Sequence, residues 1–328
     1  EIVRTRVEAK AILDKVHTEI REGRYLDVKK KRVETTFEEA VEKYLSWSFS
    51  STRHSTYLLD RLCSQTWLSF APFKGNTLNN ITGEDIEKYK QGLKNETVKN
   101  GTRNNGKPLT PRTIDMRVAR LKRLFSLCVQ WGLCEENPAE KVKLQKEDNK
   151  RTRYLSKEEE DKLLEAASPT LKKVIKLALH TGMRRGEIMG LKWSDINFQA
   201  GVIVIPGVRA KGKKERIIPL NAVVLEILQG LPTPLNRDLY VFANRKGGVW
   251  YGLVKHWEQA IDKSCIKDFR FHDLRHTYAS RLAESGIDLT KIMKLLGHED
   301  YQTTLRYSHL KPESLKEAVA VLEAYESN

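Results

Sequence analysis

The sequence has no long apolar run, no secretory signal and no paired cysteines, and each of these absences excludes a class of protein. No stretch approaches the roughly 18 uncharged apolar residues of a membrane span. Two arginines interrupt the first six residues, where a signal peptide would be apolar. The four cysteines show no short paired spacing of the kind that zinc motifs and disulfide frameworks use. We therefore expect reduced thiols, a cytoplasmic protein and no membrane partner.

Common catalytic signatures are also missing. The chain contains no phosphate-binding loop, no GxGxxG after a strand, no HExxH and no GxSxG. The sequence therefore does not predict a nucleotide-driven enzyme, a dinucleotide-dependent enzyme, a zinc peptidase or a serine hydrolase. No cluster of side chains has the spacing of metal ligands. We expect no metal and no cofactor.

Positive charge is abundant. The chain carries 58 Lys and Arg against 43 Asp and Glu, which gives a net charge of +15. The excess is spread evenly, with +8 on residues 1–150 and +7 on residues 151–328. A polyanion that contacts both halves, most simply double-stranded DNA, is the partner that this distribution predicts. A basic surface that serves only solubility is the alternative.

The first half of the chain has helical patterning, and the 328 residues allow two domains. Apolar spacing over 5–22 predicts a linker helix, and Thr36 with Glu39 forms a capping box that starts the next helix. No strand is predicted before residue 200. Residues 112–129 form an amphipathic helix whose polar faces carry the bases Arg112, Arg117, Arg120, Lys122 and Arg123. We expect these bases to contact DNA phosphates, the alternative being a merely solvated helix face.

The second half has mixed patterning. Residues 137–153 are polar and charged, as in a linker, and a capping box at Ser156 restarts the helical pattern. A helix over 170–180 ends at Gly182. β-Branched runs at 202–205 and 216–220 predict two strands, with a third short run at 240–242, and helices resume from 249. The predicted fold class is mainly α with a small antiparallel β-sheet.

Five short segments contain the side chains that could take part in catalysis. They are TGMRRGEI at 181–188, RAKGKKERIIPL at 209–220, HDLRH at 272–276, LLGHED at 295–300 and TLRYSHL at 304–310. In this order and spacing they resemble the tyrosine recombinase (phage integrase) family over residues 155–310. The helical half up to the NPAEKV segment is more weakly similar to the core-binding domain of that family. Each segment alone is weak, but the set of five is specific.

The resemblance implies roles for individual residues. Those that match the catalytic set of the family are Arg184, Lys211, His272, Arg275, His298 and the nucleophile Tyr307, with Glu187 as a supporting acid. The chemistry of phosphoryl transfer is consistent with these types. Two arginines stabilise charge on the phosphate oxygens, and a lysine can protonate the leaving 5′-hydroxyl. The resulting 3′-phosphotyrosyl bond conserves the energy of the broken linkage, so no ATP is required.

Several positions have competitors. Arg185 competes with Arg184, Lys213 and Lys214 with Lys211, and Tyr301 with Tyr307. His272 is alternatively a helix cap, and His298 alternatively a cation at a helix C-terminus. We interpret His276 and His309 as packing or hydrogen-bonding residues.

The resemblance also implies an architecture and an activity. It implies a helical, SAM-like core-binding domain at 36–140, a linker at 141–151 and an α+β catalytic domain at 152–328. Residues 1–35 are then a linker helix that follows an arm-binding domain outside this sequence. The implied activity is integration and excision of a phage or other mobile element through a Holliday junction. The implied partners are double-stranded DNA attachment sites and accessory DNA-bending or excision factors. The protein is expected to act as a homotetramer on DNA and to be associated with the nucleoid.

Three other functions compete with this one. A Xer-like resolvase shares the fold and the chemistry. A type IB topoisomerase shares the chemistry but has little site preference. A DNA-binding regulator without catalysis is the alternative from a different class, and the full set of active-site residues argues against it.

Overall fold

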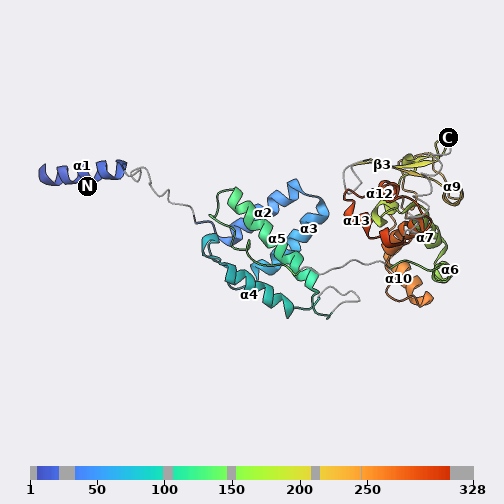
Figure 1. Cartoon of the computed structure of the whole chain (residues 1–328), viewed down its shortest axis with the longest axis horizontal. Coiled ribbons are helices and arrows are strands. Elements are labelled where there is room, and N and C mark those ends of the chain that lie inside the picture. The colour runs from blue at the N-terminus through green and yellow to red at the C-terminus, as the bar shows by residue number, and fades with distance from the viewer. Residues whose placement is uncertain are drawn as a thin grey trace, which may run out of the picture. The chain divides into compact units, whose positions relative to one another are not determined.

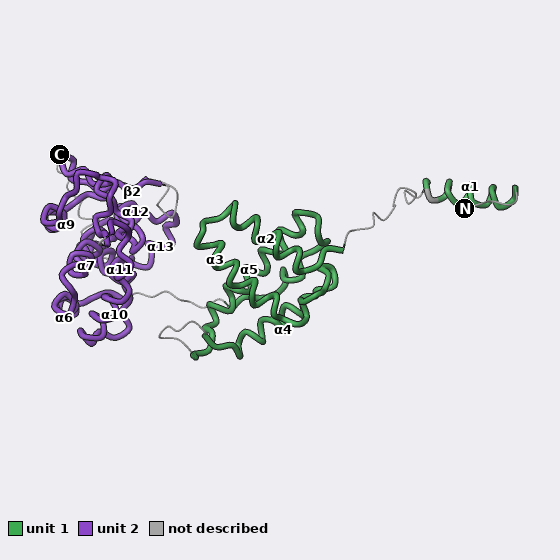
Figure 2. Tube along the Cα trace, turned by 180° about the vertical axis from the view of Figure 1, so that it is seen from behind, with its two compact units in different colours: residues 1–148 green, residues 149–328 purple. Residues whose placement is uncertain are grey.

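A computed structural model describes residues 6–21, 34–98, 106–145, 153–207, 215–244 and 246–310 (Figure 1). The chain divides into two compact units, residues 1–148 and 149–328 (Figure 2). Lys211, most of the predicted linker and the segment after 310 lie outside the described residues. The first helix, α1 (Arg6–Arg21), matches the helix predicted for 5–22. None of the described helices is long and apolar enough to span a bilayer.

Unit 1 is built from helices among its described residues. They are α2 (Phe37–Ser51), α3 (His54–Leu68), the 3₁₀ turn η1 (Leu78–Asn80), α4 (Gly83–Lys94) and α5 (Pro111–Gln130). The capping box of α2 is present, since the Glu39 amide donates to the Thr36 hydroxyl and the Thr36 amide donates to the Glu39 carboxylate. The apolar stripe of α5 is buried and consists of Ile114, Val118, Leu121, Leu124, Phe125 and Cys128. Aromatic side chains such as Tyr44, Trp67 and Phe125 fill the core between the helices.

Unit 2 combines helices with a small sheet. Its first part contains α6 (Lys157–Ala166), α7 (Pro169–Thr181), α8 (Arg185–Met189), η2 (Trp193–Asp195), β1 (Ile196–Asn197), β2 (Val202–Ile205) and β3 (Arg216–Pro219). The remainder contains α9 (Ala222–Gln229), α10 (Leu253–Ser264), α11 (Asp273–Glu284), α12 (Leu289–Leu296), α13 (Gln302–Leu305) and η3 (Ser308–Leu310). This composition confirms the predicted fold class.

The sheet is antiparallel, with the order β1-β2-β3. Strands β2 and β3 match the two predicted runs, but the prediction of no strand before 200 is wrong, because β1 pairs Ile196 with Ile203. The predicted run at 240–242 is not a strand. Tyr240 makes only an isolated bridge to Lys192. Two-residue pairings of this kind depend on the partner segment and leave no pattern of their own in the sequence.

Helix α11 organises the second unit. It packs against α7 on one side and α12 on another, and most of its residues are buried (Figure 2). The turn that ends α7 needs a glycine, because Gly182 has a φ of +61° and a Cβ there would lie 2.5 Å from the ring of Tyr278. The chain thereby turns directly from α7 into the start of α8, beside α11.

Candidate active site

The C-terminal end of α12 is the point on which three arginines converge. The backbone carbonyls of its last residues have no partner within the helix. Arg216 donates to the carbonyls of Leu295 and Leu296, and Arg275 donates to that of Leu296. Arg184 donates to the carbonyl of the following residue, Gly297, at 3.2 Å. The negative end of a helix dipole favours cations, which helps to hold this arginine cluster together.

Arg184 stands at the N-terminal end of α8. Its guanidinium donates to Glu187 at 2.9 Å, and its amide donates to the other oxygen of the same carboxylate at 2.8 Å. Glu187 is buried, whereas part of the Arg184 side chain reaches solvent. Its competitor Arg185 is exposed. The structure thus places Arg184, and not Arg185, in the cluster, with Glu187 supporting it.

Arg216, at the start of β3, is a cluster member that the sequence analysis missed. It is buried and donates to Glu187 at 2.5 Å. Burial lowers the pKa of Arg216, and the Glu187 carboxylate opposes that shift. A Cβ at Gly297, where φ is +62°, would lie 2.7 Å from the Arg216 side chain. A signal was available, because Arg216 shares the buried face of β3 with Ile218 under the period-two rule.

Arg275 lies deepest in the cluster, with 3% of its surface exposed. It donates to the carbonyl of Gly182 at 2.7 Å and to that of Leu296 at 2.5 Å. Burial, then the positive charges of Arg184 and Arg216, together lower its pKa to about 9. An anion bound beside these guanidiniums would relieve that repulsion.

The two predicted catalytic histidines border the cluster. His298 follows α12, and its Nδ1 lies 2.8 Å from the Thr304 hydroxyl. Burial, then the charges of Arg275 and Arg184, lower its pKa to about 3. His298 is therefore neutral at physiological pH, which disfavours the alternative of a cation at the helix C-terminus. His272 precedes α11 without capping it through its side chain, and partial burial followed by the charge of Arg275 lowers its pKa.

Tyr307 lies between α13 and η3 with 2% of its surface exposed. Its hydroxyl lies 2.6 Å from Nδ1 of His276, which confirms a hydrogen-bonding role for that histidine. Burial raises the pKa of Tyr307 to about 12, while the charges of Arg306 and Arg275 oppose the shift. The rival Tyr301 is 40% exposed, and His309 is exposed as well. The structure thus brings Tyr307 to the arginine cluster.

The cluster has an excess of positive charge. Arg306 lowers the pKa of His272, His298 and Tyr307, so its guanidinium also faces this site, and its buried Nε has no hydrogen-bond partner. The four arginines 184, 216, 275 and 306 face the two acids Glu187 and Asp273. Two positive charges are left over beside a tyrosine hydroxyl. Such a site is suited to bind a phosphodiester and to stabilise the charge that develops when it is attacked.

The basic residues predicted on α5 have different environments. Arg117 pairs with Glu96 at 2.7 Å and Arg120 pairs with Asp60, and their side chains are only 14% and 17% exposed. These two guanidiniums therefore have carboxylate partners within unit 1, whereas the sequence analysis expects phosphate contacts, with a solvated helix face as the alternative. Lys122 donates to the carbonyl of Glu140. Arg112 and Arg123 remain exposed.

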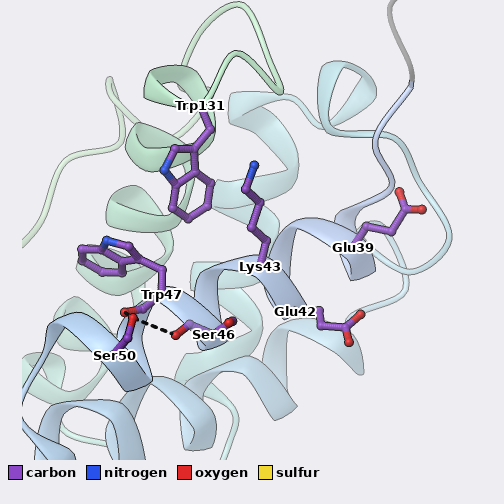
Figure 3. Close-up of a pocket in the computed structure, with 7 residues that line it drawn as sticks. All are labelled: Glu39, Glu42, Lys43, Ser46, Trp47, Ser50 and Trp131. Atoms are coloured by element: carbon purple, nitrogen blue, oxygen red, sulfur yellow. Dashed lines mark hydrogen bonds between the residues drawn. The ribbon is translucent and has the colours of Figure 1, made fainter.

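Two tryptophans carry cations on the surface of unit 1. The guanidinium of Arg123 lies 4.9 Å from the centre of the Trp47 ring, and the Lys43 ammonium lies 4.9 Å from that of Trp131. Trp47, Trp131 and Lys43 line an open pocket together with Glu39, Glu42, Ser46 and Ser50 (Figure 3). Its mixed charge gives no preference for an anion.

Comparisons with known proteins agree on one family. The model of the phage integrase family matches residues 153–314. The shufflon-specific DNA recombinase of Escherichia coli is 31% identical over 245 residues, which cover 73% of this chain and 61% of that protein. The tyrosine recombinase XerD of Listeria innocua is 30% identical over 63% of this chain and 75% of its own length.

A solved structure agrees in fold. A lambda integrase dimer bound to a COC′ core site matches with a TM-score of 0.67 and 20% identity, over 85% of this chain and 98% of that one. At this identity the match supports the same fold, in line with the sequence matches. The matched residues span both units.

Proposed function

The chain belongs to the phage integrase family and is a tyrosine recombinase; on that premise we propose that it is a site-specific DNA recombinase in which Tyr307 is the nucleophile. The observation that carries the proposal is the buried Tyr307 hydroxyl beside a cluster of arginines with two uncompensated positive charges. A buried tyrosine hydroxyl beside an excess of arginine charge is an uncommon combination. It suits an oxygen nucleophile that attacks a negatively charged phosphodiester.

The proposed cleavage step proceeds without metal or ATP. The Tyr307 oxygen forms a bond to phosphorus, and the bond from phosphorus to the 5′-oxygen breaks. The product is a 3′-phosphotyrosyl linkage that a second 5′-hydroxyl attacks to rejoin the strands. Arg184 and Arg275 hold the non-bridging oxygens, because each guanidinium keeps its charge and offers parallel donors. Glu187 fixes the orientation of Arg184.

The other members of the site have supporting roles in this proposal. Lys211, which lies in the sequence between β2 and β3, protonates the leaving 5′-oxygen, with Lys213 and Lys214 as the competing candidates. His272 and His298 orient the phosphate oxygens. Because its pKa is about 3, His298 acts as a neutral hydrogen-bonding group and adds no charge to the transition state.

We further propose that both units bind duplex DNA. Both halves of the chain are basic, and Arg112 and Arg123 are the exposed cations of α5. Unit 1, within 36–140, corresponds to a core-binding domain, and residues 152–328 to a catalytic domain. The assembly on paired attachment sites is a tetramer that acts with accessory DNA-bending or excision factors in the nucleoid. Integration and excision of a mobile element then proceed through a Holliday junction.

Covalent trapping tests this function. The protein is incubated in EDTA with nicked duplexes from the junctions of its mobile element, and adducts that resist SDS are counted. We expect an adduct with the wild type and none with Tyr307→Phe. Tyr301→Phe is the matched control, because it removes the exposed neighbouring hydroxyl and should cleave normally. An adduct of undiminished yield with Tyr307→Phe would refute the assignment.

A further inference from the structure

The hydrogen bond between Tyr307 and His276 assigns a task that the proposed mechanism leaves open. The phenol oxygen lies 2.6 Å from Nδ1 of His276, and only 2% and 8% of the two residues is exposed. Both side chains are thus shielded from bulk water. The ring of His276 in turn meets the ring of His272 edge-on, with 5.2 Å between the ring centres. His276 comes directly after Arg275 on α11, within the arginine cluster.

A tyrosine nucleophile must lose its proton as it attacks. Burial raises the pKa of Tyr307 to about 12, so the hydroxyl is protonated at physiological pH. A neutral phenol is a weak nucleophile, and transfer of its proton in the transition state requires an acceptor at hydrogen-bond distance. Water has little access to this hydroxyl. A side chain of the site at hydrogen-bond distance is therefore well placed to be the acceptor.

The other bases of the site have partners of their own. Glu187 accepts from Arg184 and Arg216, so its basicity is reduced by two guanidiniums. His298 has its Nδ1 at the Thr304 hydroxyl and a pKa of about 3, which makes it a weak proton acceptor. His272 is exposed and meets the ring of His276 edge-on, whereas the hydrogen bond of the Tyr307 hydroxyl is to His276.

We propose that His276 is a catalytic residue that takes the proton of Tyr307 during cleavage and returns it during rejoining. This inference rests on the proposed function. The proton moves from the phenol oxygen to Nδ1 of His276 while that oxygen bonds to phosphorus and the 5′-oxygen leaves with a proton from the lysine acid. In rejoining, the incoming 5′-oxygen bonds to phosphorus and gives its proton to the now neutral lysine, while the bond from phosphorus to Tyr307 breaks and the phenol regains its proton from His276. The resting tautomer carries its hydrogen on Nε2.

The groups around His276 are two histidines and the nucleophile. His272 faces it from the preceding turn, Tyr307 from the segment between α13 and η3, and His298 from the end of α12. His298 is neutral, so it does not oppose protonation of His276. Arg275 and Arg306 also act on Tyr307, where they favour the phenolate that forms as the proton leaves, while Asp273 disfavours it.

The same hydrogen bond admits an opposite role, in which it restrains Tyr307 until DNA binds. The two roles predict effects of opposite sign. If His276 accepts the proton, its replacement slows cleavage. If His276 restrains the nucleophile, its replacement accelerates cleavage.

The test is single-turnover cleavage of a nicked duplex by His276→Asn and His276→Ala. Asparagine keeps a polar atom near the position of Nδ1 and can hold the phenol, but it cannot take a proton. We expect His276→Asn to form the Tyr307 adduct at least about 100-fold more slowly than the wild type. His276→Ala should be equally slow, and added imidazole should restore part of its rate by occupying the vacated space.

The matched control is His256→Asn. His256 also has its Nδ1 near a hydroxyl, that of Ser168 at 3.2 Å, in the same unit. This variant should cleave at the wild-type rate and should not respond to imidazole. DNA affinity and melting temperature of all variants are measured alongside, so that a folding defect is recognised.

Three results would overturn the proposal. Cleavage by His276→Asn at the wild-type rate would mean that His276 only holds the phenol in place. Faster cleavage by this variant would mean that His276 restrains Tyr307 until DNA binds. A slow, folded His276→Ala that imidazole does not restore would make its role structural. If His276→Ala fails to fold, a second test uses His276→Asn with fluorotyrosine at position 307. The phenol of fluorotyrosine is more acidic and needs less help to lose its proton, so this change must recover part of the cleavage rate. No recovery would overturn the proposal. If the wild type itself forms no adduct, the proposed function fails instead.

Discussion

Arginines that are at least partly buried occur in both units, but their partners differ. In unit 1, Arg120 pairs with the fully buried Asp60 and Arg117 pairs with Glu96, so each guanidinium has its own carboxylate. In unit 2, Arg184 and Arg216 share Glu187, and Arg275 donates to backbone carbonyls. A matched pair stabilises a fold and has no charge left for a ligand. An unmatched cluster stores positive charge that an anion can neutralise, which is what catalysis at a phosphate requires.

The strongest test of this contrast removes an unmatched arginine. Arg275→Ala should lower the cleavage rate by about 10²–10³-fold, because one donor to the developing charge of the transition state is lost. Binding to the DNA site should remain, since most phosphate contacts lie elsewhere. Single-turnover cleavage and a binding titration measure the two effects. Cleavage that survives Arg275→Ala would mean that the cluster is not the catalytic site.

A matched arginine should behave in the opposite way. Asp60→Ala leaves Arg120 without its carboxylate and Ser48 without its acceptor, and should cost about 2–3 kcal/mol of unfolding free energy. Urea denaturation measures this cost. Glu84→Ala is the control, because Glu84 pairs with Lys88 on an exposed surface, where an ion pair contributes little. Equal stability of the two variants would contradict a structural role for the Arg120 pair.

Arg216 sharpens the comparison, because it links the acid of the cluster to the end of α12. Arg216→Lys keeps a charge but loses the fork that reaches Glu187 and two carbonyls at once. We expect cleavage to slow by about 10–100-fold through misplacement of Arg184. Arg281→Lys, which alters the ion pair with Glu160 in the same unit, is the control and should cleave normally. Equal rates for both variants would leave Arg216 with a purely structural role.

Another prediction concerns the dependence of stability on pH. The folded-state pKa of His298 is about 3, below the ordinary value of 6.5. Between these two pH values His298 is protonated in the unfolded chain and neutral in the folded chain. This contribution to stability is complete above pH 6.5 and is lost as pH falls towards 3. The urea midpoint of the wild type should drop over that range more steeply than that of His298→Gln. Parallel curves would show that burial and the arginine charges do not lower the pKa of His298 in the folded protein.

Local structure was largely predictable from the sequence. The capping boxes at Thr36 and Ser156, the buried stripe of α5 and the break at Gly182 all depend on neighbours within a few residues. Strands β2 and β3 were predicted for the same reason. The short β1 was not, since it exists only through its pairing with β2.

The residue types of the site were predictable from the sequence, whereas the ion pairs and hydrogen bonds between them were less so. The motifs place Arg184, Arg275, His298 and Tyr307 in one unit, and the structure brings them together. The motifs do not indicate that Arg216 would share Glu187 with Arg184. They also do not indicate that the helix α5 arginines 117 and 120 would find acids 21 and 60 residues away. Such long-range pairs are set by the packing of helices, which periodicity alone does not encode.

Identification of the residue that becomes linked to DNA tests the central claim most directly. After cleavage of a nicked duplex, the DNA is trimmed by nuclease and the modified peptide is sequenced by mass spectrometry. We predict a nucleotide attached through a 3′-phosphate to Tyr307, the hydroxyl beside the unmatched arginines. A nucleotide attached to Tyr301 or to any other residue would contradict the assignment of this cluster as the catalytic centre.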